Sequence, residues 1–291
     1  DVLVSQDEVK SQQREVRSLD YVKPDEPEVK SKIEINNNTA TITYPNGVTK
    51  NIKINISGVP EPQKRLEELN KALNELPEEV KRDLFNEVNT INICPVSDDG
   101  NPNTAGRFYY ETSSISLIYR MVENEPFSGI NPNTIAHEVG HAIHEMNGNH
   151  LTESEEQSLR EKFEAFKSKF NQSVKTDNND PAGVVKKYFT QSFEEFFAEY
   201  YAMSRGCADD TEKNRYEYMH LMNDLREIYG RDEYIDLCNA CEAIIQGRRD
   251  QYKSDGSGIT EETFNNRIKN YNIIHGEGVN SPVIRALNNL I

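Results

Sequence analysis

The most informative segment of the chain reads Asn133-Thr-Ile-Ala-His137-Glu138-Val-Gly-His141-Ala-Ile-His144-Glu-Met146. Residues four apart on a helix stand one above the other, so His137 and His141 project side by side from one face. The other face is apolar at helical spacing, which predicts an amphipathic helix over 133–147. The apolar members of that face are Ile135, Val139, Ala142, Ile143 and Met146.

This arrangement of two histidines and a glutamate suits a single metal ion. Two imidazoles held four residues apart supply two nitrogens to one Zn²⁺, and Glu138 then lies near the open coordination position. There Glu138 can take a proton from water and later deliver it to a leaving amine. We expect His144, one turn beyond His141, to line the cleft or support the ligands. The alternative to a metal site is an ordinary amphipathic helix whose histidines lie on the protein surface.

Three schemes can supply a third ligand. An extended motif needs Gly and His three and six residues after His141, but His144 and Asn147 occupy those places. His150 is displaced from the required spacing. The remaining scheme takes a glutamate from a later helix, and the sequence Ser192-Phe-Glu-Glu195-Phe-Phe-Ala-Glu199 fits it.

Glu195 and Glu199 lie four apart on one face of that later helix. We expect Glu195 to bind the zinc and Glu199 to accept a hydrogen bond from a ligand histidine, which fixes its tautomer. Two alternatives remain open. Ser192 and Glu195 also have the spacing of a helix capping box. Glu194 is a rival ligand, although Ala198 stands where its acidic partner would have to be.

Together these segments resemble the gluzincin zinc peptidases, in particular the anthrax lethal factor catalytic domain and the Pro-Pro endopeptidases. The likeness rests on His137-Glu-Val-Gly-His141 and on Tyr188 preceding the Glu195-Phe-Phe-Ala-Glu199 run, and it spans about residues 105–205. It implies zinc ligands at His137, His141 and Glu195, a general base at Glu138 and an oxyanion hydrogen bond from Tyr188.

The resemblance also implies a mixed β-sheet whose edge strand lies along the cleft, and we expect that strand at Ser114–Tyr119. An edge strand there would pair an extended peptide substrate. Tyr188 is one of 14 tyrosines, and the alternative is that it merely packs. The interval between His141 and Glu195 carries a charged helix and a polar loop, so the family's specificity does not carry over to this chain.

The order of elements predicts an α+β fold, with strands first and helices afterwards. Alternation with period two predicts a small meander of strands at 32–36, 40–44 and 49–56. An amphipathic helix pair over 63–89 is broken at Pro77. Further strands are expected at 90–94, 107–110 and 114–119, and further helices at 153–171, 181–187, 192–205, 211–229, 232–246 and 260–270.

These elements predict a zincin-like domain over 61–205, with a small mixed sheet, the HExxH helix and a helical second half. A polar arm at 1–31 and the β-meander at 32–60 precede it, and a helical extension at 206–291 follows. Cys238 and Cys241 lie on a predicted apolar helix face, so we expect packed or disulfide-paired cysteines rather than a functional pair.

Charge and hydropathy exclude several classes of function. The chain has 33 basic and 49 acidic residues, a formal net charge of −16, so clustered cations for nucleic-acid binding are not expected. No apolar run reaches about 18 residues, so no membrane insertion is expected. Four cysteines in 291 residues exclude a disulfide-dense scaffold.

The leading functional hypothesis is a zinc endopeptidase with a thermolysin-like mechanism, one catalytic Zn²⁺ and an extended protein or peptide substrate. The alternative is a binding or assembly protein, of a phage-like or surface structure, with an accessory zincin domain. The resemblance favours a secreted or cell-surface bacterial location, with cytoplasmic and phage-associated locations as alternatives.

Overall fold

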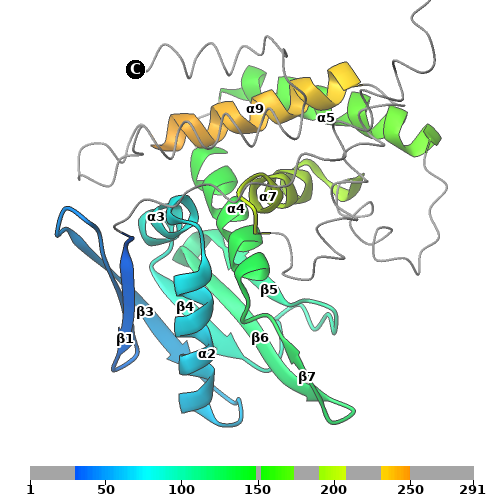
Figure 1. The fold of residues 1–291 in the computed structure, drawn as a ribbon. Coiled ribbons are helices and arrows are strands. Elements are labelled where there is room, and N and C mark those ends of the chain that lie inside the picture. Colours follow the sequence, from blue (N-terminus) through cyan, green and yellow to red (C-terminus); the bar gives the residue numbers. More distant parts are fainter. Residues whose placement is uncertain (1–29, 149–151, 174–189, 208–230, 250–291) are drawn as a thin grey trace, which may run out of the picture. The chain divides into compact units, whose positions relative to one another are not determined.

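The computed structural model describes residues 30–148, 152–173, 190–207 and 231–249. All of the elements below belong to one compact unit, Ser31–Ile291 (Figure 1). The predicted polar arm, apart from its last residues, lies outside the described part of the chain. The same is true of Tyr188 and of the helices predicted at 181–187, 211–229 and 260–270.

Three antiparallel strands form the predicted meander: β1 (Lys32–Asn36), β2 (Thr39–Thr43) and β3 (Thr49–Ile56). Buried and exposed residues alternate along them, as the period-two pattern predicts. Asn37 and Asn38 turn β1 into β2 with positive φ angles of 46° and 63°, a conformation that Asn tolerates.

Two helices connect the meander to the next strand. They are α2 (Pro62–Glu75) and α3 (Glu78–Glu87), separated at Pro77 as predicted. The chain then enters β4 (Thr90–Cys94), which pairs parallel to β3. The meander is therefore continuous with one seven-stranded sheet, and the domain boundary predicted near residue 60 falls inside that sheet.

The remaining strands are β5 (Gly106–Tyr109), β6 (Ser114–Val122) and β7 (Glu125–Ser128), with a 3-10 turn, η1 (Tyr110–Thr112), between the first two. The strand order is β1-β2-β3-β4-β6-β5, and β7 also pairs with β6. The prediction of an edge strand at Ser114–Tyr119 is wrong, because β6 has β4 on one side and β5 on the other. Its first six residues are all buried, which is typical of a central strand.

The second half of the described chain is helical: α4 (Pro132–Gly148), α5 (Glu153–Ser173), α7 (Phe193–Ser204) and α9 (Arg231–Arg249). Asn131 starts α4, since its side-chain oxygen accepts the Thr134 N–H at 2.8 Å and Pro132 follows at the first helical position. Figure 1 shows α2, α3 and α4 in front of the strands, and α4 also packs against α7.

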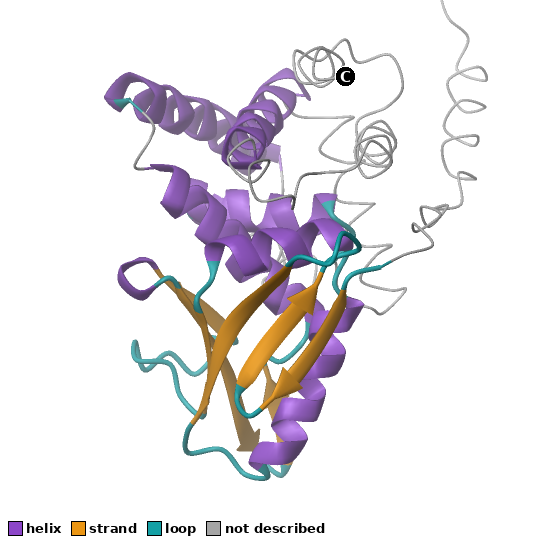
Figure 2. Ribbon diagram, turned by 90° about the vertical axis from the view of Figure 1, so that its left-hand side faces the viewer, coloured by secondary structure: helices purple, strands orange, loops and turns teal. Residues whose placement is uncertain are grey.

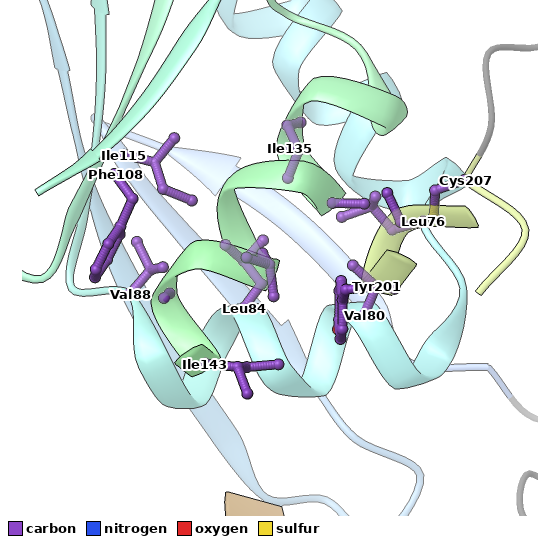
Figure 3. Close-up of a cluster of buried hydrophobic side chains, with 14 of the residues drawn as sticks. Leu76, Val80, Leu84, Val88, Phe108, Ile115, Ile135, Ile143, Tyr201 and Cys207 are labelled. Atoms are coloured by element: carbon purple, nitrogen blue, oxygen red, sulfur yellow. The ribbon is translucent and has the colours of Figure 1, made fainter. Parts of the chain in front are cut away.

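Figure 2 shows the strands with helices beside them, and the hydrophobic core lies between the sheet and the helices (Figure 3). Figure 3 shows Leu84 of α3, Ile135 of α4 and Ile115 of β6 within the same cluster. Cys238 and Cys241 are buried on α9 and form no disulfide, so the packed alternative is correct and the disulfide alternative is not.

A mixed sheet with helices packed against it is compatible with the predicted α+β class. Within the described ranges, no helix has the length and apolar character needed to cross a membrane.

Candidate metal centre

The predicted ligands come together where α4 crosses α7. At this crossing Gly140 lies so close to Ala198 that a Cβ atom on Gly140 would be 2.8 Å from the Ala198 Cα and 3.1 Å from the Tyr201 Cβ. Small residues at a helix contact let the two backbones approach, and longer side chains on either side then meet. His137 and His141 flank Gly140 in this way on α4, while Glu195 and Glu199 flank Ala198 on α7.

His137, His141 and Glu195 offer ligand atoms that all lie within 4.8 Å of one another. Glu195 Oε2 lies 3.3 Å from His137 Nε2, and Glu195 Oε1 lies 3.6 Å from His141 Nε2. The two histidine Nε2 atoms are 3.1 Å apart. A tetrahedral zinc with bonds near 2.0–2.1 Å separates its ligand atoms by about 3.3 Å, so these residues fit the ion.

Glu199 occupies the supporting position predicted for it. Its Oε1 accepts a hydrogen bond from His137 Nδ1 at 2.8 Å. A proton held at Nδ1 leaves the Nε2 lone pair of His137 directed at Glu195 and His141, which is the tautomer that a metal requires. Burial lowers the pKa of His137, but its hydrogen bonds to Glu195 and Glu199 outweigh burial and raise this pKa well above its usual value, so a metal ion bound at Nε2 would have to displace a proton.

Glu138 is buried, with 4% of its surface exposed, and lies beneath strand β5. A Cβ atom on Gly106 would come 2.8 Å from Glu138 Oε1 and 2.6 Å from Thr134 Cγ2, so a larger residue at this point of the strand would displace the Glu138 carboxylate or the Thr134 side chain. Burial raises the pKa of Glu138, against the lowering influence of His137, His141 and the Phe108 backbone N–H. A raised pKa suits a group that must both take and return a proton near neutral pH.

The structure separates Glu195 from its rival. Glu194 lies 3.5 Å from Arg160, on the side of α7 that faces α5, and outside the cluster of ligand atoms. The capping alternative for Glu195 also holds in part, because the Ser192 hydroxyl accepts the Glu195 backbone N–H at 3.2 Å. The cap uses the backbone of Glu195, which leaves its carboxylate for the two histidines.

His144 lies one turn beyond His141 and packs between two phenylalanine rings of α7. Its ring centroid is 5.2 Å from that of Phe193 and 5.3 Å from that of Phe197. Burial lowers the pKa of His144 to about 4, and its Nδ1 has no hydrogen-bond partner among the described residues. His144 is thus a neutral packing residue at the α4–α7 contact and no member of the ligand cluster.

Two contributors to the site were missed by the sequence reasoning: Gly106 and Gly140. Gly140 was visible as the small residue directly before His141, but its role depends on Ala198, which lies 58 positions later by residue number. Gly106 had no signal, because nothing in the sequence tells which strand passes over Glu138. Tyr188, the predicted oxyanion donor, lies outside the described residues.

Comparison with known proteins adds no relative. No family model matches the chain, and neither a curated protein nor a solved structure matches it. Within the described residues, His137, His141 and Glu195 form the only group of three that can hold a metal ion.

Proposed function

We propose that this protein is a zinc-dependent endopeptidase. One observation carries the proposal: the ligand atoms of His137, His141 and Glu195 lie as far from one another as the ligands of one zinc ion do. The buried carboxylate of Glu138 lies beside them. Three protein ligands that leave one position open are typical of catalytic zinc, whereas structural zinc is closed by four.

Each residue has a definite role in this proposal. Bound zinc would polarise the scissile carbonyl and make a water molecule more acidic. Glu138 would take the proton from the attacking water and pass it to the leaving amine, for which its position next to His137 is suitable. Glu199 would hold His137 in the metal-binding tautomer through their 2.8 Å hydrogen bond. Tyr188, by the resemblance, would donate to the oxyanion.

An extended peptide is the substrate that the sheet favours. Ala105 O accepts from the Ile118 N–H at 2.9 Å, and hydrogen-bonded pairs alternate along an antiparallel ladder. Gly106 and Phe108 therefore direct their backbone N–H and C=O groups away from β6. These groups lie next to Glu138, so a peptide added along β5 would pass the catalytic carboxylate. We therefore propose β5, instead of the strand at 114–119, as the strand that pairs the substrate.

The test is cleavage mapping on a proteome-derived peptide library with zinc-loaded protein. Wild type, Glu138→Gln and Glu194→Gln are compared, and the last is the matched control because Glu194 pairs with Arg160 outside the cluster. We expect internal cleavage by wild type and Glu194→Gln, and a loss of at least about a thousandfold for Glu138→Gln with zinc retained. Equal cleavage by Glu138→Gln contradicts its role as base. No cleavage by any zinc-loaded protein contradicts the endopeptidase proposal and favours the binding-protein alternative.

A further inference from the structure

A hollow lies on the face of the sheet opposite to the one that packs on the hydrophobic core. Here strands β3 to β6 and the loop after β4 enclose an open hollow of about 460 Å³. Its lining combines polar and apolar surface from several elements, and the polar side chains include Asn55, Asn92, Ser116, Tyr109 and Asp98.

The floor of the hollow is a row of small polar side chains across three adjacent strands. Asn55 of β3 stands directly opposite Asn92 of β4, which stands opposite Ser116 of β6. The Asn55 Nδ2 donates to Asn92 Oδ1 at 3.0 Å. Asn is depleted in strands, and β-branched residues at these central positions would stabilise the sheet more. Places where a sequence departs from its local preference are often functional sites.

The loop that follows β4 forms the wall. The Tyr109 hydroxyl donates a hydrogen bond to Asp98, which ties this loop to β5 at the edge of the hollow. Arg107 is not part of the lining, and its Nη1 lies 3.1 Å from Asp99 and 3.8 Å from Asp98, so the neighbouring cation is shared by the two carboxylates. The wall therefore presents one carboxylate and one phenol beside the amides and hydroxyls of the floor.

The lining restricts the ligand by its charge. None of the described residues that line the hollow is Lys or Arg, which disfavours phosphate, sulfate or a nucleic-acid backbone. Among the described residues, the one cluster of side chains that could hold a metal ion is at the α4–α7 contact, so the hollow offers no such cluster. Amide and hydroxyl groups both donate and accept hydrogen bonds, which is the complement of a ligand rich in hydroxyl groups.

We propose that this hollow, formed by Asn55, Asn92, Ser116, Tyr109 and Asp98, binds a neutral oligosaccharide. The amides and Ser116 would hydrogen-bond the sugar hydroxyls, and the Asp98 carboxylate would accept from two of them. The site does not depend on the proposed peptidase. Successive residues of β5 face opposite sides of the sheet, so Tyr109 faces the hollow while Phe108 is buried on the side of Glu138.

The test measures binding of three neutral trisaccharides to the full chain: maltotriose, cellotriose and triacetylchitotriose, with inorganic phosphate as the charged comparison. Isothermal titration is run on wild type, Asn92→Val and Asn55→Val. The matched control is Asn51→Val, because Asn51 lies on the same outer face of β3, bonds Thr41 at 2.8 Å and is not part of the lining. Valine suits a strand, so all three variants are expected to fold.

We expect at least one trisaccharide to bind with a Kd below about 1 mM. Asn92→Val and Asn55→Val should each weaken it by about tenfold, as expected for a lost hydrogen-bonding partner, while Asn51→Val should leave it unchanged. The proposal is overturned if none of the three sugars binds, if the control loses binding as much as the lining variants, or if phosphate binds as tightly as the sugars. Cleavage of peptides is not measured, so failure here leaves the peptidase proposal standing.

Discussion

Gly140 of α4 lies against Ala198 of α7, and a Cβ atom at position 140 would be only 2.8 Å from the Ala198 Cα. This contact is what sets the distance between the two helices that carry the candidate ligands. His137 and His141 precede and follow Gly140, and Glu195 approaches both of them from α7 at 3.3 and 3.6 Å. The geometry of the metal centre therefore depends on a residue that touches no metal.

Substituting Gly140→Ala should weaken zinc binding although every ligand is kept. The added methyl group meets backbone on α7, so the helices must separate. We expect zinc affinity to fall by about tenfold or more, the scale seen when support for a ligand is lost. Overpacking lowers the free energy of unfolding by about 1–3 kcal/mol. This loss exceeds the roughly 1 kcal/mol by which Ala stabilises a helix relative to Gly. Competition with a chromogenic chelator measures the affinity, and urea unfolding measures the stability.

Gly247→Ala is the matched control for that substitution. Gly247 also lies within a helix, α9, but a Cβ atom there would have no atom within 4 Å. In this variant the free energy of unfolding should rise by up to about 1 kcal/mol, and zinc should bind as tightly as it does to wild type. If Gly140→Ala behaves like Gly247→Ala, the close contact between α4 and α7 does not control the site.

Glu199→Gln should lower metal affinity without removing a ligand. Glu199 accepts from His137 Nδ1 at 2.8 Å, and a carboxylate in this position raises the basicity of the ligand histidine. The expected loss in zinc affinity is about 10- to 100-fold. Glu194→Gln on the same helix should bind zinc with unchanged affinity, because its partner is Arg160. Equal affinities for wild type and Glu199→Gln would remove Glu199 from the site.

Arg205 joins three helices through buried charges. Its Nε donates to Glu79 of α3 at 2.9 Å, and its Nη1 donates to Glu242 of α9 at 2.8 Å. Arg205→Leu removes the cation that both buried carboxylates bind. The free energy of unfolding should therefore fall by about 3–5 kcal/mol. Arg160→Leu breaks surface pairs with Glu156 at 2.9 Å and Glu194 at 3.5 Å, and it should lower the free energy of unfolding by about 1 kcal/mol or less. Urea unfolding of both variants at neutral pH distinguishes the two cases.

His144 should make stability depend on pH. Burial lowers its pKa from 6.5 to about 4, so between these values the unfolded chain binds a proton that the folded chain excludes. The stabilisation is fully present above pH 6.5 and is lost as the pH falls toward 4, by about 3 kcal/mol in total. His144→Leu should remove this part of the pH dependence. Unfolding is measured from pH 7 to pH 4 in EDTA, and identical slopes for both proteins would exclude His144 as the cause.

Local pattern was sufficient for most of the elements. The strands predicted at 32–36 and 49–56 are β1 and β3, and the break at Pro77 separates α2 from α3, because alternation and proline act through neighbouring residues. Strand β7 was missed, since Glu125-Pro-Phe-Ser128 is short and contains a proline that strands disfavour.

Pairing between distant elements was harder to predict. The helices over 62–87 form a crossover that places β4 parallel to β3, so the meander continues into the main sheet and is no separate module. The run Ser114–Tyr119 was assigned to an edge, although six consecutive buried residues favour a central strand. The spacing of His137, His141, Glu195 and Glu199 did predict which side chains meet, because helical periodicity places each pair on one face.

The most direct test of the zinc endopeptidase proposal is a titration of activity with metal. Protein stripped by a chelator is mixed with increasing zinc, and cleavage of a peptide identified by library mapping is followed. We predict that activity rises in proportion to zinc and levels off at about one ion per chain, as a single three-ligand site requires. Glu195→Gln should need at least about tenfold more zinc to reach half of its maximum. Full activity in the stripped protein, or no cleavage after one equivalent of zinc has bound, would contradict the proposal.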